Sequence, residues 1–96
     1  MDQAFQAQAG TLESCDALVT VIRSSADSGV AVAVESSVAG RFTDEIRRQV
    51  LAVADTLSVT DIAVRVIDRG ALNFVLQARV ETALRRLLDA EQEAAQ

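Results

Sequence analysis

The sequence predicts an α+β domain: a three-stranded sheet with two helices packed on one of its faces. Along the chain, the apolar residues change between a period of two, typical of strands, and a period of three to four, typical of helices, in the order β-β-α-β-α. The chain has 96 residues, 50% of them hydrophobic, which is enough for one small domain around one core. Since each amphipathic element must cover one face, two helices on a small sheet satisfy all five elements.

The first two strands are expected at residues 16–23 and 30–35. The segment DALVTVIR is rich in β-branched residues, and VAVAVE alternates in character from one residue to the next. Between them, SSADSG is a cluster of turn-forming residues that ends in glycine. We therefore expect the two strands to pair as an antiparallel hairpin.

An amphipathic helix is expected after the second strand. Ser36 or Ser37 can supply its N-cap oxygen, but Gly40 disfavours a regular first turn, so that the regular helix can also begin as late as Thr43. The apolar positions recur at steps of three and four residues, at Val38, Phe42, Ile46, Val50, Val53, Ala54 and Leu57.

A third strand is expected at residues 59–67, VTDIAVRVI, followed by a second helix from Ala71 to about Asp89. Asp68 is placed to cap this helix. The apolar positions of the helix are Leu72, Leu76, Val80, Ala83, Leu84 and Leu87, and its outer face is expected to carry Gln77, Arg79, Glu81, Arg85 and Arg86.

Both ends of the chain are expected to be flexible. Residues 1–10 mix glutamine and alanine without a clear period, and residues 90–96, AEQEAAQ, carry no large apolar side chain. This divides the chain into an N-terminal segment at 1–10, a folded domain at 11–89 and a C-terminal tail at 90–96. The pattern does not determine the strand order.

The charge balance excludes two classes of partner. The chain has 14 acidic and 9 basic residues and a net charge of −5, whereas nucleic acids and anionic membranes attract an excess of basic residues. The single cysteine, Cys15, cannot form an internal disulfide, and the N-terminus MDQAFQAQAG lacks the basic and apolar regions of a secretion signal. We therefore expect a cytoplasmic protein.

Residues 10–16 read GTLESCD and stand directly before the apolar run ALVTVI. The chain contains no histidine to activate the hydroxyl of Ser14, which argues against a hydrolase nucleophile. We assign no catalytic residue and no metal ligand. A hydroxyl on a loop that enters a strand is instead both reachable and held in place by the sheet.

Two sequence blocks resemble a known family. Residues 9–16, AGTLESCD, are similar to the AGTLESGD motif of the acyl carrier protein, or gamma subunit, of bacterial citrate lyase. Residues 68–72, DRGAL, followed by Ala78-Arg79, are similar to the D-K-G-A-L and A-R-L-E segments of that family. A weaker match is Ser36-Ser37-Val38, ahead of a helix with Ile46-Arg47. The resemblance spans roughly residues 9–88.

The resemblance implies a covalent acyl carrier. In that family the motif serine, here Ser14, is joined through a phosphodiester to 2′-(5″-phosphoribosyl)-3′-dephospho-coenzyme A, whose thiol carries acetyl and citryl groups. The alpha subunit exchanges acetyl for citryl, and the magnesium-dependent beta subunit splits the citryl thioester. A separate prosthetic-group transferase attaches the arm and can supply the base, so the carrier needs no histidine and catalyses neither step.

The residues around Ser14 have alternative interpretations. Glu13 and Asp16 can repel the phosphodiester, dock on a basic enzyme surface, or simply be solvated. Cys15 replaces the family glycine and would be strained at positive φ, and its thiol is expected to be a partly buried bystander.

Residues Asp68, Arg69 and Gly70 form a second candidate site. They can line the path of the arm, with Arg69 and the N-terminus of the second helix contacting its phosphates. The alternative is a cap and turn that serve folding alone.

Other functions remain possible from the sequence. The carrier of malonate decarboxylase uses the same cofactor but lacks the T-L-E before the serine, and a citramalate lyase carrier is indistinguishable. Carriers of the fatty-acid type are four-helix bundles with a D-S-L motif, which does not fit. The alternative of another class is an unmodified acidic adaptor that binds a protein partner.

Overall fold

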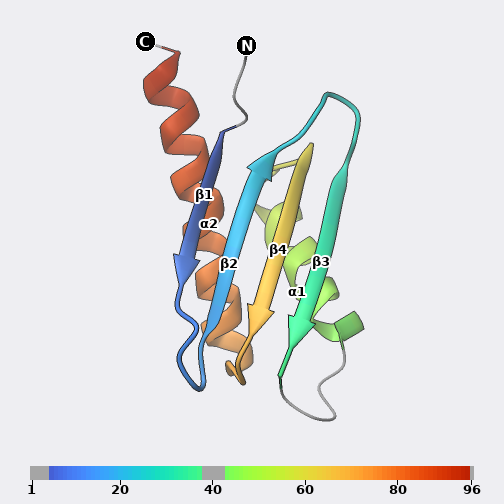
Figure 1. Cartoon of the computed structure of the whole chain (residues 1–96). Coiled ribbons are helices and arrows are strands. Elements are labelled where there is room, and N and C mark those ends of the chain that lie inside the picture. The colour runs from blue at the N-terminus through green and yellow to red at the C-terminus, as the bar shows by residue number, and fades with distance from the viewer. Residues whose placement is uncertain (1–4, 38–42, 96) are drawn as a thin grey trace.

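The computed structural model describes residues 5–37 and 43–95. It confirms a small α+β domain with two helices against one sheet, but the sheet has four strands instead of the predicted three (Figure 1). In chain order, the elements are β1 (Gln6–Gly10), β2 (Ala17–Arg23), β3 (Val30–Ser36), α1 (Thr43–Thr56), β4 (Ile62–Asp68) and α2 (Asn73–Ala94).

The strand order is β1-β2-β4-β3, with β2 antiparallel to both of its neighbours and β3 parallel to β4. The predicted hairpin of residues 16–23 with 30–35 is therefore wrong, because β4 lies between these strands. The start of β4 is bonded to the intervening loop: the Ser24 N–H donates to the Asp61 carbonyl at 2.8 Å, and the Gly29 N–H donates to the Asp61 carboxylate at 3.0 Å.

The additional strand, β1, comes from the segment that was expected to be flexible. Residues 6–10 pair along their whole length with β2 in antiparallel register. The alanines of β1 are the more buried and belong to or pack against the core, whereas its glutamines are exposed. Alanine and glutamine rarely form strands, so that the period of two is easily overlooked. Tertiary packing against α2 decides the conformation here.

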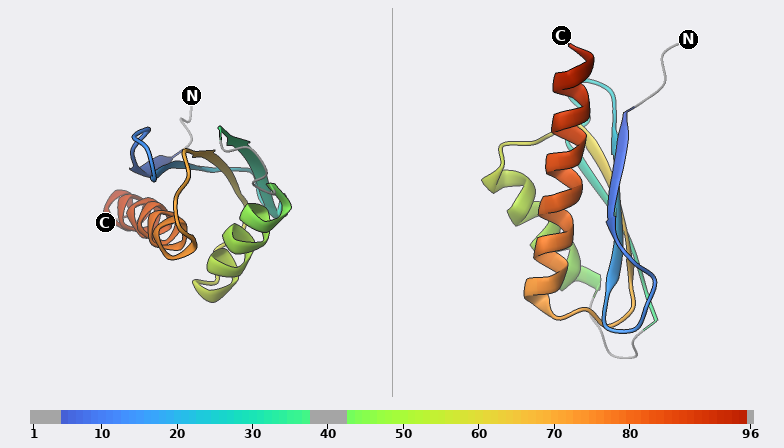
Figure 2. Two further views of the ribbon diagram at one scale, coloured as in Figure 1. Left: turned by 90° about the horizontal axis from the view of Figure 1, so that it is seen from below. Right: turned by 90° about the vertical axis from the view of Figure 1, so that its left-hand side faces the viewer.

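Both helices cover the same face of the sheet and enclose the core between the two layers (Figure 2). Helix α1 begins at Thr43, the later of the two predicted starts. Ser36 is the last residue of β3 and is not an N-cap of this helix. The predicted helix positions within residues 38–42 lie outside the described residues. No described helix is long and apolar enough to cross a membrane.

Helix α2 continues to Ala94, past the predicted end at Asp89, so residues 90–94 of the expected tail are helical. An ion pair fastens this last part of the helix to the sheet: the Arg23 guanidinium donates to both carboxylate oxygens of Glu91, at 2.6 and 2.7 Å. The hydrogen bond from Arg23 lowers the pKa of Glu91.

Asp68 closes the turn between β4 and α2. Its side chain is fully buried, and its carboxylate accepts hydrogen bonds from the Ala71 N–H at 3.1 Å and from the Ser36 hydroxyl at 2.9 Å. The N-cap position of α2 is Leu72, which has no side-chain cap. The prediction that Asp68 caps the helix is therefore wrong: the carboxylate holds the turn that precedes it.

Candidate functional site

Ser14 lies in the loop that joins β1 to β2, at the end of the sheet where β4 ends and α2 begins (Figure 1). It is exposed, and within residues 5–37 and 43–95 no group bonds to its hydroxyl. The loop turns tightly here, because the Asp16 N–H donates to the Glu13 carbonyl at 3.2 Å. Ser14 therefore occupies the second position of a four-residue turn, with its hydroxyl available to another molecule.

Cys15 occupies the third position of this turn, with φ at 64°. Ser14 does not share the positive φ, and this combination is that of a type II turn, in which glycine is strongly favoured at the third position. The predicted strain is therefore present. The thiol is exposed, contrary to the expectation of a partly buried side chain.

The backbone of the residue directly after β4, Arg69, holds the turn from one side. The Cys15 N–H donates to the Arg69 carbonyl at 2.8 Å, and the Arg69 N–H donates to the Asp16 carbonyl at 2.9 Å. These two bonds continue the β2–β4 ladder beyond its last pair, Ala17 opposite Asp68. The residue that follows Ser14 is therefore fixed to the sheet.

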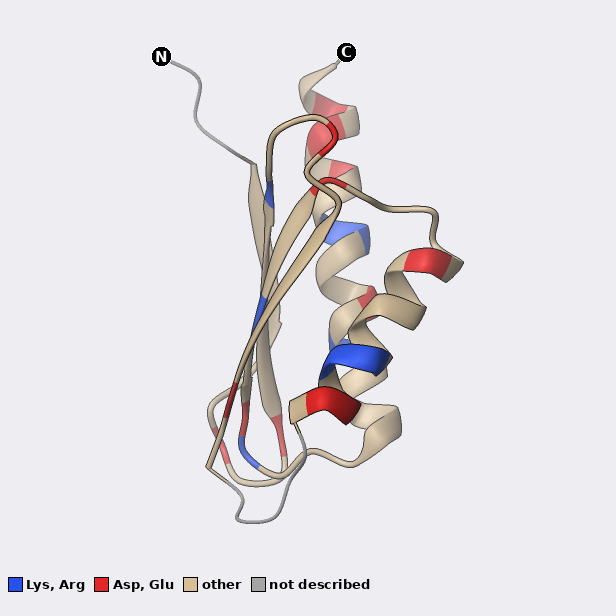
Figure 3. Cartoon of the chain, turned by 90° about the vertical axis from the view of Figure 1, so that its right-hand side faces the viewer, with Lys and Arg blue, Asp and Glu red and all other residues tan. Residues whose placement is uncertain are grey.

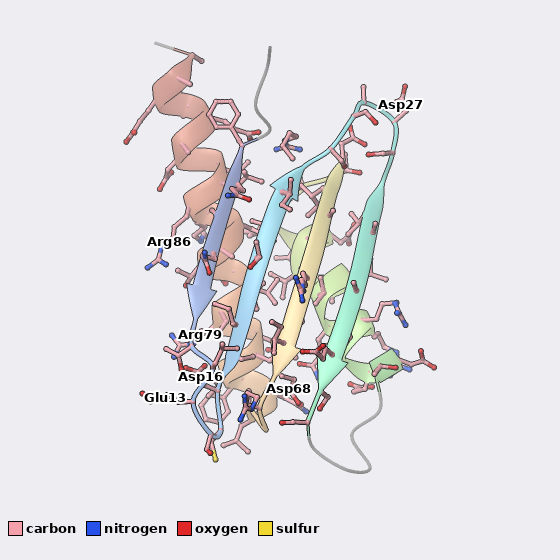
Figure 4. The ribbon with its side chains drawn as sticks, in the orientation of Figure 1. Glu13, Asp16, Asp27, Asp68, Arg79 and Arg86 are labelled. Atoms are coloured by element: carbon pink, nitrogen blue, oxygen red, sulfur yellow. The ribbon has the colours of Figure 1, made fainter. Side chains whose placement is uncertain are left out.

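The side chain of Asp16 holds the turn from the other side, and it is buried (Figure 4). Arg79 of α2 donates from Nε and Nη2 to its two carboxylate oxygens, at 2.9 and 3.0 Å. The Thr11 hydroxyl donates at 2.7 Å, and so does the Ala17 N–H. Asp16 is thus neither solvated nor a charge that faces outward, which corrects the interpretation from the sequence; only Glu13 is exposed.

This pairing stabilises the ionised form of Asp16. The hydrogen bond from Arg79 is the largest cause, and together with the bonds from Thr11 and Ala17 it outweighs burial and lowers the pKa of Asp16 from 3.8 to about 2. The same contact raises the pKa of Arg79. The pair is charged at every pH at which the protein would work.

The stability that the pair provides should therefore be lost in acid. Because the pKa of Asp16 is lower in the folded chain, its contribution is complete above pH 3.8 and disappears as the pH falls towards 2. We expect Asp16→Asn to lower the free energy of unfolding by about 1–2 kcal/mol at pH 6, a value reduced by solvent screening because Arg79 is 40% exposed. Urea unfolding of both proteins should show this difference shrinking between pH 4 and 2. A difference that persists at pH 2 would contradict the assignment.

Comparisons with known proteins point to one family. The family model described as "ACP: Malonate decarboxylase delta subunit (MdcD)" matches residues 5–87. The citrate lyase acyl carrier protein of Weissella paramesenteroides is 42% identical over 93% of this chain and 90% of its own. That of Yersinia enterocolitica is 43% identical over 88% and 86% of the two chains, and that of Vibrio cholerae O395 is 41% identical over 95% and 92%.

The chain belongs to the citrate lyase acyl carrier protein family. Its fold is similar to that of a chain in the crystal structure of a Pseudomonas malonate decarboxylase hetero-tetramer in complex with malonate, with a TM-score of 0.71 over 88% of each chain. The identity there is 19%, so that this likeness concerns the fold alone. The resemblance of residues 9–16 and 68–72 to citrate lyase acyl carrier proteins is thereby confirmed.

The carrier brings the two predicted site segments together, but through the backbone. Arg69 bonds to the turn by its main chain, and its side chain is exposed. Asp68 is fully buried and engaged by Ser36 and Ala71, so it does not reach the surface near Ser14. Of the second candidate site, the Arg69 side chain is the exposed group.

Two residues that position Ser14 were missed from the sequence, Thr11 and Arg79. Both bond to the Asp16 carboxylate, yet Arg79 is 63 positions away in the chain and was expected on the outer face of its helix. The available signals were the two motif blocks: Thr11 belongs to AGTLESCD and Arg79 to the Ala78-Arg79 match, in both cases without a stated role.

Restoring the family glycine should stabilise the carrier. Cys15→Gly removes the Cβ from a residue at φ 64° and should raise the free energy of unfolding by about 1 kcal/mol, as measured by urea unfolding. Asp27→Gly is the matched control, since Asp27 has φ 65° in another loop, but aspartate tolerates this region better and should gain less. An equal or smaller gain for Cys15→Gly would argue against strain at this turn.

Proposed function

We propose that the protein is the acyl carrier subunit of citrate lyase and that Ser14 carries 2′-(5″-phosphoribosyl)-3′-dephospho-coenzyme A through a phosphodiester. When bound, this group supplies the thiol that carries acetyl and citryl groups between the alpha and beta subunits. The carrier catalyses neither reaction, and its location is cytoplasmic. The observation that carries the proposal is an exposed Ser14 hydroxyl, bonded to none of the described residues, on a turn fixed from both sides.

The residues of the chain fit a tethered arm. An attachment enzyme needs access to the hydroxyl, which exposure provides, and it can supply the base that a chain without histidine lacks. The backbone bonds of Arg69 to the turn and the ion pair of Arg79 with Asp16, together called the clamp, give the arm a fixed origin. A short tether from a fixed origin raises the local concentration of its thiol at nearby sites.

The charges around Ser14 suit a phosphodiester that points away from the domain. Arg79 already neutralises Asp16, so Glu13 is the exposed carboxylate that repels the phosphate, while the exposed Arg69 is the nearest candidate to contact it. These two roles remain part of the proposal.

The relatives favour citrate lyase over malonate decarboxylase. Identity is 42% with the Weissella citrate lyase carrier, but 19% with the chain of the malonate decarboxylase structure. A malonate decarboxylase carrier is nevertheless the second candidate, because the family model that matches residues 5–87 bears its name. The larger subunits that co-purify with the chain distinguish these two functions and a citramalate lyase.

The deciding experiment is the intact mass of the chain purified from its own host during growth on citrate. We expect the mass increment of the complete nucleotide arm, located by peptide mapping to the segment that contains Ser14. The same chain from a host without the attachment enzymes should have its unmodified mass. An unmodified chain from citrate-grown cells would favour the adaptor.

A further inference from the structure

The face of the sheet opposite the helices is uncovered by residues 5–37 and 43–95 (Figure 2). Much of this face is apolar although it is open to water: β2 and β4 each place two apolar residues on it, on either side of a central polar residue. Its central apolar residues lie side by side in register and are Leu18, Ile22, Ala31, Ala33, Ala63 and Ile67.

Small side chains make this open face hollow on one side. The alanines of β3 and β4 surround a shallow depression of about 200 Å³, bordered by Ile22 and Arg65. A depression of this size accepts one large side chain of another molecule, and such insertions dominate the energy of protein interfaces.

Arg65 stands at the middle of the open face, between Thr20 and Ala33 in the register. It is exposed, and its side chain forms no ion pair or hydrogen bond with a described residue. The other arginine on a described strand, Arg23, is paired with Glu91. Acidic residues lie mainly towards the ends of the sheet (Figure 3), and the carboxylate that the described strands place on the open face is Glu35, two positions beyond Ala33 and without an ion pair to Arg65. A partner that covers Arg65 must therefore bring a carboxylate to it.

A second copy of the chain is disfavoured by charge, although Glu35 of β3, opposite Ile67, gives the face one carboxylate of its own. If the face packed on itself about a two-fold axis at its centre, Arg65 would meet Arg65 of the other copy in a desolvated contact. The net charge of −5 also opposes association of two copies.

We propose that the open face docks a catalytic subunit of the lyase complex, with a carboxylate of that subunit against Arg65 and a bulky apolar side chain in the depression. This proposal rests on the proposed function. The face begins at Leu18, four positions from Ser14. A subunit bound to the face therefore lies beside the turn at residues 13–16 and leaves Ser14 uncovered. The domain is then anchored by its sheet while the arm swings from a fixed point.

The test measures the affinity of the purified alpha and beta subunits of citrate lyase for the carrier and its variants. For one of the two subunits, we expect Arg65→Glu to weaken binding at least tenfold and Ala31→Gln, which fills the depression, about fivefold. Arg48→Glu is the matched control, since Arg48 lies in a different hollow, a groove of about 610 Å³ between α1 and α2, and should change the affinity less than twofold. Circular dichroism checks that each variant is folded.

Three results would overturn the proposal. Wild-type binding that neither face variant weakens excludes the face, and so does an equal loss in Arg48→Glu, which would indicate the helix groove or a general charge effect. Self-association of the free carrier that Arg65→Glu abolishes would make a second copy the occupant. If the wild-type carrier binds neither subunit and Ser14 carries no arm, the proposed function itself fails, which is distinguishable from failure of the face alone.

Discussion

Ser14→Ala is expected to abolish the covalent mass increment completely, and with it the lyase activity of the reconstituted complex. The Ser14 hydroxyl is exposed and bonds to no described group, so its removal should change the free energy of unfolding by less than about 0.5 kcal/mol. The expected result is therefore a folded protein that cannot be loaded. Intact mass after incubation with the attachment enzymes measures the loss, and urea unfolding measures the stability.

Ser25→Ala is the control for this experiment. Ser25 is an exposed serine of the loop between β2 and β3, whose position at the opposite end of the sheet is marked by Asp27 in Figure 4. The Ser25→Ala variant should receive the arm at Ser14 like the wild type. An arm that persists on Ser14→Ala would locate the attachment at another residue.

Gly10→Ala is expected to cause a large loss of stability. Gly10 ends β1 at φ +96°, and a Cβ there would lie 1.8 Å from the Ala17 carbonyl oxygen and 3.3 Å from the Arg79 Cδ. The first contact is with backbone, which cannot move without breaking the β1–β2 pair. We expect a loss of at least about 3 kcal/mol in the free energy of unfolding, measured in urea.

Gly29→Ala separates the two causes of this effect. Gly29 also has positive φ, +72°, but nothing lies within 4 Å of an added Cβ. It should lose only about 1 kcal/mol, from the backbone conformation alone. Equal losses at both positions would show that the close approach of Ala17 to Gly10 does not matter.

The sequence predicted the elements whose pattern is local. Strands β2, β3 and β4 and helices α1 and α2 each have a period that is visible within about ten residues, and their existence is confirmed. The additional strand was missed because alanine and glutamine at residues 6–10 have weak strand preference, and it forms by pairing with β2 and packing on α2.

The wrong hairpin has a different cause. A turn-forming segment such as residues 24–29 shows that the chain reverses, but not whether the two strands then touch. Here the Asp61 carboxylate and carbonyl bond to the two ends of this loop, and β4 enters between the strands. This information lies in Asp61 and β4, which follow α1 in the chain, and is absent from residues 16–35 themselves.

The site could be located from the sequence, but its construction could not. Ser14 and Arg69 were named, whereas the partnership of Asp16 with Arg79 joins residues 63 positions apart. Neither residue type signals such a partner, and Asp16, which is buried, was accordingly interpreted as a surface charge. A motif identifies which residues matter, and the structure supplies the contact by which they act.

The clamp on the turn at residues 13–16 makes the geometry of Ser14 depend on the last described helix, because Arg79 belongs to α2. A nascent or partly unfolded chain in which this helix has not docked lacks the clamp, although its motif is complete. An attachment enzyme that recognises the clamped turn would thus modify folded chains and leave incompletely folded ones unmodified.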